Sequence, residues 1–307
     1  MHGSDSEREG ESLKHGQIRK ALSGFYYLYD QGETVRSKGR GVFRVRGVTP
    51  LVGDLVDYEK DGENDAVIVN VHDRKNELVR PPIANVDQAL LVFSVKEPNF
   101  SPKLLDRFLA VIESYDVEPV IIMTKTDLLD DGGREKIRRY KEYYRSIGYT
   151  VLETSIGDGS VASELGPIIE GKTSVLTGQS GVGKSTLLNT LMPELELKTD
   201  EISDSLGRGR HTTRHVELIE FAGGLVADTP GFSSLDFDHI EKEDLARCFA
   251  EFAELSENCK FRGCLHLKEP KCAVKSAVES GEAEQFRYDH YIQFLQEIID
   301  RKPRYPS

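Results

Sequence analysis

The sequence contains no long hydrophobic run. Its apolar stretches, such as Gln88–Phe93 and Val120–Met123, cover only a few residues, whereas a membrane-spanning helix needs about 20. The amino terminus begins with the polar residues Met1-His2-Gly3-Ser4 and shows no apolar signal region. These absences exclude membrane-spanning helices, and we expect no membrane partner.

The sequence also has few cysteines and carries no net positive charge. Only four cysteines occur in 307 residues, without a paired framework, which is typical of a reducing compartment. We therefore expect a cytoplasmic protein. The net charge of −12 argues against indiscriminate nucleic-acid binding, so any such contact must come from a local basic patch.

Residues 15–80 alternate short β-like runs with glycines, which predicts a small all-β barrel. The runs are Gly24–Tyr29, Gly41–Val45, Leu55–Tyr58 and Ala66–Val69. Five basic residues lie at even positions, and an unbroken strand would put them on one face: Arg36, Lys38, Arg40, Arg44 and Arg46. That face is either an ordinary solvated surface or a patch that contacts RNA phosphates.

From residue 81 the pattern changes to alternating strands and helices. Strands are predicted over residues 87–95, 118–123 and 149–153, and Ser101-Pro102 is typical of a helix start. This alternation predicts a mostly parallel, doubly wound α/β sheet that binds ligands at the carboxyl ends of its strands.

A phosphate-binding loop follows the predicted buried strand Ser174–Leu176. The residues that fit its pattern are Gly178, Gln179, Ser180, Gly181, Val182, Gly183, Lys184, Ser185 and Thr186. The glycines let backbone N–H groups surround phosphate oxygens at the start of a helix. In this pattern Lys184 reaches the outer phosphates and the Ser185 hydroxyl ligates Mg²⁺.

A base-recognition motif precedes this loop in the sequence. Thr124, Lys125, Thr126 and Asp127 end one predicted strand, and Ser155 follows the next. The Asp127 carboxylate can accept two hydrogen bonds from guanine, and adenine offers no such pair. Lys125 is expected along the base and Ser155 near the guanine O6. The combination favours GTP and argues against a P-loop ATPase or small-molecule kinase.

Two further groups of residues suggest metal ions. Asp228 and Gly231 end a predicted strand where an acid near Mg²⁺ and an N–H at the γ-phosphate are expected, and Thr213 or Thr212 can supply a second hydroxyl to the metal. Near the carboxyl terminus, soft ligands suited to tetrahedral Zn²⁺ lie close together: Cys259, Cys264, His266 and Cys272. Four ligands leave no open position, so we expect this zinc to be structural.

All the motifs of a GTPase are present, but the base motif comes before the phosphate motif. The chain thus resembles a circularly permuted GTPase. With a barrel before it and a Cys/His cluster after it, the chain is similar to the RsgA (YjeQ/YloQ) family of bacterial small-ribosomal-subunit biogenesis GTPases. The polar, charged residues 1–14 are expected to form a disordered tail. The resemblance implies an OB-fold RNA-binding domain (15–80), a permuted GTPase domain (81–234) and a helical zinc-binding domain (235–307).

The resemblance also implies hydrolysis of GTP to GDP and phosphate, stimulated by the small (30S) ribosomal subunit late in its maturation, with rRNA as a partner. We expect a monomer. Phe232 follows Gly231 where Ras-like proteins place a water-orienting glutamine, and the resemblance points to His211 as the substitute, acting with Lys184. The alternative is a nucleotide-gated RNA-binding module whose hydrolysis is incidental.

Overall fold

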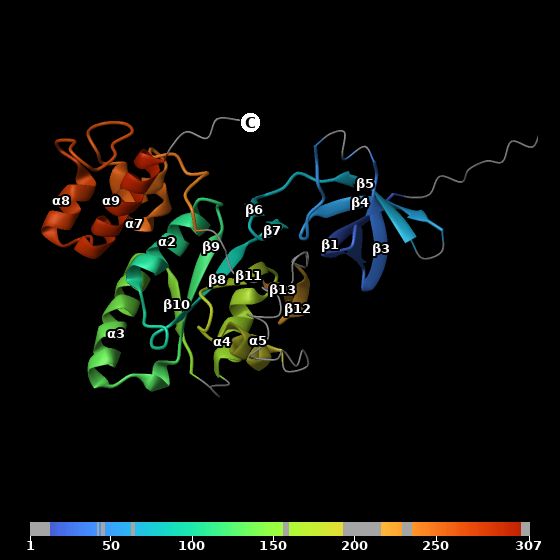
Figure 1. The fold of residues 1–307 in the computed structure, drawn as a ribbon, viewed down its shortest axis with the longest axis horizontal. Coiled ribbons are helices and arrows are strands. Elements are labelled where there is room, and N and C mark those ends of the chain that lie inside the picture. Colours follow the sequence, from blue (N-terminus) through green and yellow to red (C-terminus); the bar gives the residue numbers. More distant parts are fainter. Residues whose placement is uncertain are drawn as a thin grey trace, which may run out of the picture.

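A computed structural model describes residues 13–41, 43, 47–62, 65–155, 160–192, 216–228 and 235–301. It shows a barrel at one end, a six-stranded sheet with helices in the middle, and a group of helices at the other end (Figure 1). Within these described ranges, no helix has the length and apolarity to cross a membrane.

Five strands close the barrel in the order β1-β2-β3-β5-β4. They are β1 (Lys14–Leu22), β2 (Phe25–Asp30), β3 (Glu33–Gly39), β4 (Leu55–Asp61) and β5 (Asp65–Val71). Ile18, Leu28 and Ile68 are fully buried inside it. The barrel prediction is confirmed. Of the predicted strand Gly41–Val45 only Gly41 and Phe43 are described, and neither is in a strand. The strand of this region ends at Gly39, and Gly41 lies in a turn.

The barrel is joined to the sheet through a hairpin, β6 (Glu77–Val79) and β7 (Pro82–Ala84). Asp54 is fully buried, and its two carboxylate oxygens each accept a hydrogen bond of 2.8 Å from Arg74 just before the hairpin. Gly53 has a φ of +92°, and a Cβ there would lie 2.0 Å from the Ala84 carbonyl oxygen. Only glycine fits this close approach.

The central sheet has the order β10-β9-β8-β11-β13-β12. All neighbouring pairs are parallel except β12 with β13. The strands are β8 (Gln88–Ser94), β9 (Glu118–Thr124), β10 (Thr150–Glu153), β11 (Thr173–Thr177), β12 (Leu218–Phe221) and β13 (Gly224–Asp228). The predicted doubly wound α/β sheet is therefore confirmed, with one antiparallel edge strand.

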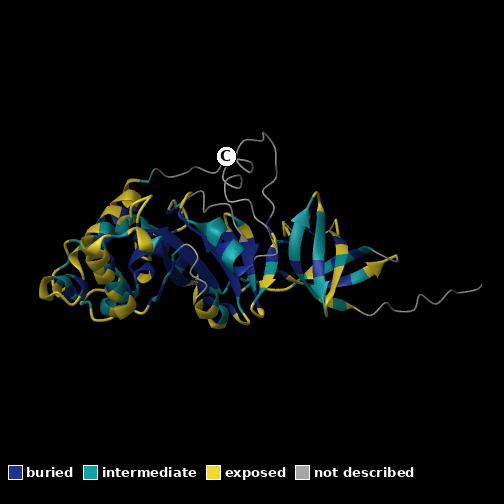
Figure 2. Ribbon diagram, turned by 90° about the horizontal axis from the view of Figure 1, so that it is seen from below, coloured by how far each residue is buried: buried dark blue, intermediate teal, exposed yellow. Residues whose placement is uncertain are grey.

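Helices cover both faces of this sheet. They are α2 (Pro102–Glu113), α3 (Asp131–Ser146), α4 (Ser160–Ile169) and α5 (Lys184–Leu191). Alternate residues of the buried strand β8 point to opposite sides: Leu91 belongs to the core shared with α2 and α3, and Leu90 to the core shared with α4 and α5. The sheet interior is buried throughout (Figure 2).

The carboxyl-terminal region consists of η3 (Leu245–Cys248), α7 (Ala250–Ser256), α8 (Ala273–Ser280) and α9 (Gln285–Asp300). An aromatic core holds it together, because the Tyr291 ring packs edge-on against Phe249 and Phe252, with ring centroids 5.4 and 5.5 Å apart. α9 and η3 both pack against α2 of the central domain.

A buried ion network links this region to the central domain. The Arg287 side chain on α9 is fully buried and donates to Asp106 Oδ1 on α2 at 2.6 Å. It also donates to both carboxylate oxygens of Glu251 on α7, at 2.7 and 2.9 Å. The Tyr144 hydroxyl on α3 donates to the same Asp106 oxygen at 2.5 Å. Helices of the central domain and of the carboxyl-terminal region therefore meet around one guanidinium group.

Replacing Arg287 by methionine leaves two carboxylates near each other without their cation. We expect the free energy of unfolding to fall by about 3–5 kcal/mol, measured by urea denaturation followed through tyrosine fluorescence. Arg247→Met is the matched control, because its ion pair with Asp244 is largely exposed and contributes about 0–1 kcal/mol. Equal losses in the two variants would show that the network does not hold the helices together.

Candidate functional site

The predicted phosphate loop connects β11 to α5 at the middle of the sheet. Every residue of β11 is buried, and Gln179, Ser180 and Gly181 of the loop are exposed. Gly178 has a φ of +145°, and a Cβ there would lie 2.2 Å from the Val92 carbonyl oxygen of β8. The first glycine is thus required for contact with the neighbouring strand. Gly183, at a φ of +98°, is the residue before α5.

Lys184 begins α5 and lies back over the loop. Its ammonium group donates to the carbonyl oxygens of Gly178 at 2.8 Å and Gln179 at 2.6 Å. Ser185 and Thr186 follow in the first turn and are half-buried. The free N–H groups at the start of a helix, together with an ammonium group held over the loop, form a site suited to phosphate oxygens.

The predicted base motif lies directly beside this loop. Thr124 ends β9 and is buried, and its hydroxyl donates to the Val182 carbonyl oxygen at 2.5 Å. Lys125 has a left-handed φ of +61°, and its ammonium group donates to the Gly181 carbonyl oxygen at 2.9 Å and to that of Glu97. Two residues of the base motif therefore hold the carbonyl groups of the phosphate loop.

A pocket opens between the base motif and α5. Its lining includes Thr124, Lys125 and Ser155 from the carboxyl ends of β9 and β10, and Gly183, Thr186 and Leu187 from the start of α5. Thr126 follows Lys125 and bonds the Thr154 carbonyl oxygen at 3.4 Å. A flat group attached to phosphates on the loop can enter this pocket.

Asp127 does not line the pocket between the base motif and α5. It is exposed and lines a second pocket that Ser155 also borders. Its carboxylate makes no hydrogen bond or ion pair with the part of the chain that the structure describes. The acceptor pair that the sequence assigns to guanine is therefore accessible, but it lies in this second pocket and not in the one beside α5.

The predicted magnesium and catalytic residues are only partly described. Asp228 ends β13 and pairs in register with Leu176 of β11, next to the phosphate loop. His211, Thr212, Thr213, Gly231 and Phe232 lie outside the described residues.

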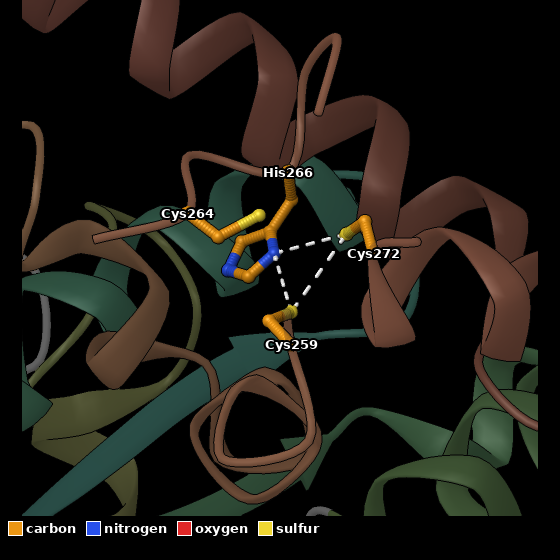
Figure 3. Close-up of side chains that lie close together, drawn as sticks. All are labelled: Cys259, Cys264, His266 and Cys272. Carbon is orange, nitrogen blue, oxygen red and sulfur yellow. Dashed lines mark hydrogen bonds between the residues drawn. The ribbon is translucent and has the colours of Figure 1, made fainter. Parts of the chain in front are cut away.

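The four predicted zinc ligands come together in the carboxyl-terminal region (Figure 3). Their ligand atoms all lie within 4.8 Å of one another. His266 Nδ1 is 3.2 Å from Cys272 Sγ and 3.7 Å from Cys259 Sγ. These separations fit four ligands around one tetrahedral ion, since Zn–S and Zn–N bonds are about 2.3 and 2.0–2.1 Å long.

Residues around the cluster support a metal site. The His266 side chain is buried, and its other ring nitrogen, Nε2, lies 3.0 Å from the Ser256 hydroxyl, which fixes the ring so that Nδ1 faces the sulfurs. Burial lowers the pKa of His266 and raises the pKa of the Cys264 thiol to about 12. The imidazole is thus held neutral, as a ligand must be, and a bound metal must displace protons from the thiols.

The predicted basic face is described only in part. Arg36 and Lys38 are exposed on β3 with Ser37 buried between them, as alternation requires. Arg36 donates to Asp65 at 2.7 Å, and Arg40, just beyond the strand, donates to Glu59 at 2.6 Å. Two of the three described cations are therefore paired with acids. Arg44 and Arg46 lie outside the described residues.

The sheet carries its base motif on β9 and its phosphate loop after β11, so the order of the two along the chain is the reverse of their order in Ras-like proteins. Circularly permuted P-loop GTPases are the class of protein that this fold and site define. The family model described as RsgA GTPase matches residues 71–238, and the one described as RsgA N-terminal domain matches residues 15–68. The chain belongs to the RsgA GTPase family.

Curated relatives are similar over nearly the whole chain. The small ribosomal subunit biogenesis GTPase RsgA of Shouchella clausii is 58% identical over 293 residues, covering 95% of this chain and 100% of its own. The protein of the same name from Bacillus subtilis is 56% identical over 298 residues, with the same coverage.

Solved structures agree with the fold. YloQ, described as a circularly permuted GTPase, has a TM-score of 0.83 at 50% identity and covers 97% of this chain and 99% of its own. YjeQ from Thermotoga maritima has a TM-score of 0.84 at 38% identity, with coverage of 95% and 100%.

The contact between Thr124 and the phosphate loop leads to a prediction. Thr124→Val removes the hydroxyl that bonds the Val182 carbonyl, and Thr124→Ser keeps a hydroxyl there. We expect the valine variant to bind GTP and GDP about tenfold more weakly, as the loss of one buried hydrogen bond implies, and the serine variant to bind them nearly normally. Titration with fluorescent nucleotides measures both, and equal affinities in the two variants would contradict a supporting role of the hydroxyl.

Proposed function

We propose that this protein hydrolyses GTP to GDP and phosphate as an assembly factor in late maturation of the small ribosomal subunit, in the bacterial cytoplasm. The observation that carries the proposal is the direct contact of a guanine-type base motif with a phosphate loop in a permuted sheet. Near-full-length similarity to proteins named for small-subunit biogenesis supports the biological role.

In the proposed site the phosphate loop binds the triphosphate through its N–H groups, and Lys184 turns from the loop carbonyls to the outer phosphates. The side chains of Ser185, Asp228 and Thr213 hold Mg²⁺, with the Gly231 N–H at the γ-phosphate. When bound, Mg²⁺ neutralises phosphate charge. His211 positions the attacking water, because Phe232 has no polar group for that task. Ser155 and Asp127 read the base.

The proposed partner is ribosomal RNA, contacted by the barrel. Lys38 makes no ion pair within the described residues and is the readiest phosphate ligand. Arg36 and Arg40 must exchange their carboxylate partners, Asp65 and Glu59, for phosphate groups. A structural zinc ion held by Cys259, Cys264, His266 and Cys272 is proposed to fix the loop that carries Lys260 and Arg262, which presents more charge to RNA.

Asp127→Asn tests the guanine assignment. Replacing one carboxylate oxygen by an amide turns an acceptor into a donor, so we expect the preference for GTP over ATP to fall by about 10- to 100-fold, as for a hydrogen bond to a charged group. Competition of the two nucleotides for the protein measures this ratio. Asp131→Asn, an exposed aspartate in the first turn of α3, is the control and should keep the preference. An unaltered ratio in Asp127→Asn would mean that the base pocket is misassigned.

GTP hydrolysis with and without purified small ribosomal subunits tests the partner and the catalytic histidine together. We expect the subunits to stimulate the wild-type protein strongly, and His211→Ala to bind GTP normally but lose most of the stimulated rate. His239→Ala, which changes a histidine of the carboxyl-terminal region, should be stimulated normally. A wild-type protein that the subunits do not stimulate would refute the assembly role, and full stimulation of His211→Ala would refute only the role of that residue.

A further inference from the structure

Three side chains that can bind a metal ion meet on the outer surface of the barrel. In the pairing of β1 with β4, His15 lies directly opposite Asp57, and in the pairing of β4 with β5, Asp57 lies opposite Asn70. His72 comes two residues after Asn70, directly beyond the end of β5. Because side chains alternate along a strand, this register brings all four to one face.

The aspartate is the fixed member of this group. The neighbours of Asp57 on β4, Val56 and Tyr58, are buried in the barrel, so Asp57 points outward, yet its side chain is only 10% exposed beneath the two histidines. Its Oδ2 accepts a hydrogen bond from the Asn70 amide at 3.0 Å. An outer hydrogen bond of this kind commonly orients a carboxylate that ligates a metal.

The other oxygen of Asp57 faces both imidazoles. His15 Nδ1 is 2.6 Å and His72 Nε2 is 2.7 Å from Asp57 Oδ1, and the ligand atoms all lie within 4.8 Å of one another. Ligand atoms around a tetrahedral zinc ion are about 3.3 Å apart, given bonds of about 2.0–2.1 Å. The rings must therefore move back by less than 1 Å, roughly, from their hydrogen-bonded positions. Their exposed fractions of 70% and 41% allow this movement.

We propose that His15, Asp57 and His72 form a second metal site, for a divalent transition-metal ion such as Zn²⁺, with water completing the coordination. Two imidazoles and one carboxylate are ligands that Zn²⁺ binds well in proteins, and magnesium and calcium prefer oxygen ligands. This site is separate from the Cys/His cluster, which lies in the other terminal part of the chain.

An ion at this position joins the strands that close the barrel. β1 is the first strand among the described residues, and its pairing with β4 completes the circle of strands. The ion links β1 to β4 through His15 and Asp57, and to the end of β5 through His72. We therefore expect binding to raise the melting temperature of the barrel, because an ion that binds only the folded state stabilises that state.

Zinc content after equilibrium dialysis of the tag-free, full-length protein against micromolar free Zn²⁺ tests the site. We expect two zinc ions per chain in the wild type, one in His72→Gln and one in Cys264→Ser, because the two substitutions remove different ions. His239→Gln, which also removes one histidine, should retain two. Asn70→Ala should keep the ligands but weaken the second site by about 10- to 100-fold.

A second measurement uses only the wild-type protein: zinc binding should shift the ¹⁵N resonances of His15 Nδ1 and His72 Nε2. Thermal unfolding of each variant checks separately that the substitutions leave the protein folded. One zinc ion per chain in the wild type, or two in His72→Gln, would overturn the proposal. If Cys264→Ser loses zinc while His72→Gln retains all the zinc that the wild type binds, the bound ion belongs to the Cys/His cluster and the proposal fails.

Discussion

The buried guanidinium of Arg287 is the constraint that fixes the carboxyl-terminal helices against the helices of the central sheet. A charge taken out of water destabilises a fold unless it is paired and fully hydrogen-bonded. Here the partners of Arg287 come from α2 and α7, and Tyr144 of α3 donates to the same Asp106 oxygen. α9 can therefore occupy only a position that brings these helices together. Because α2 and α3 cover one face of the sheet, the carboxyl-terminal region is fixed to that face.

The contact between the base motif and the phosphate loop gives the permuted order a structural meaning. Thr124 and Lys125 bond the carbonyl groups of Val182 and Gly181, so the loop is held by a strand from the earlier part of the chain. β8 and β11 are neighbours in the sheet although more than 70 residues separate them. What the sheet requires is the spatial order of its strands, and a different order along the chain leaves the site intact.

The surface of the barrel carries two kinds of polar group in a strongly acidic chain: basic side chains and a cluster of metal ligands. Two of its described arginines are paired with acids, Arg36 with Asp65 on the neighbouring strand β5 and Arg40, just beyond β3, with Glu59 on β4, which reduces the net positive charge of the face expected to contact RNA. On another part of the same surface, the His15, Asp57 and His72 group concentrates metal ligands at the seam between β1 and β4. The Arg36–Asp65 pair and the histidine–aspartate group both arise from cross-strand register.

The sequence by itself determined the features that depend on local pattern: the strand–loop–helix around Gly178, the base motif at a strand end, the buried strands of the sheet and the spacing of the cysteines. Each is encoded within a short stretch, where glycine geometry, periodicity or ligand chemistry acts directly. β1 was not predicted, because its residues are mostly polar and its one fully buried side chain, Ile18, gives no alternating pattern. Only the tertiary structure decided which distant residues meet. The Thr124 bond to Val182, the Arg287 network and the meeting of His15 with His72 all join residues far apart in the chain, and such pairings are set by strand register and helix packing rather than by neighbouring sequence.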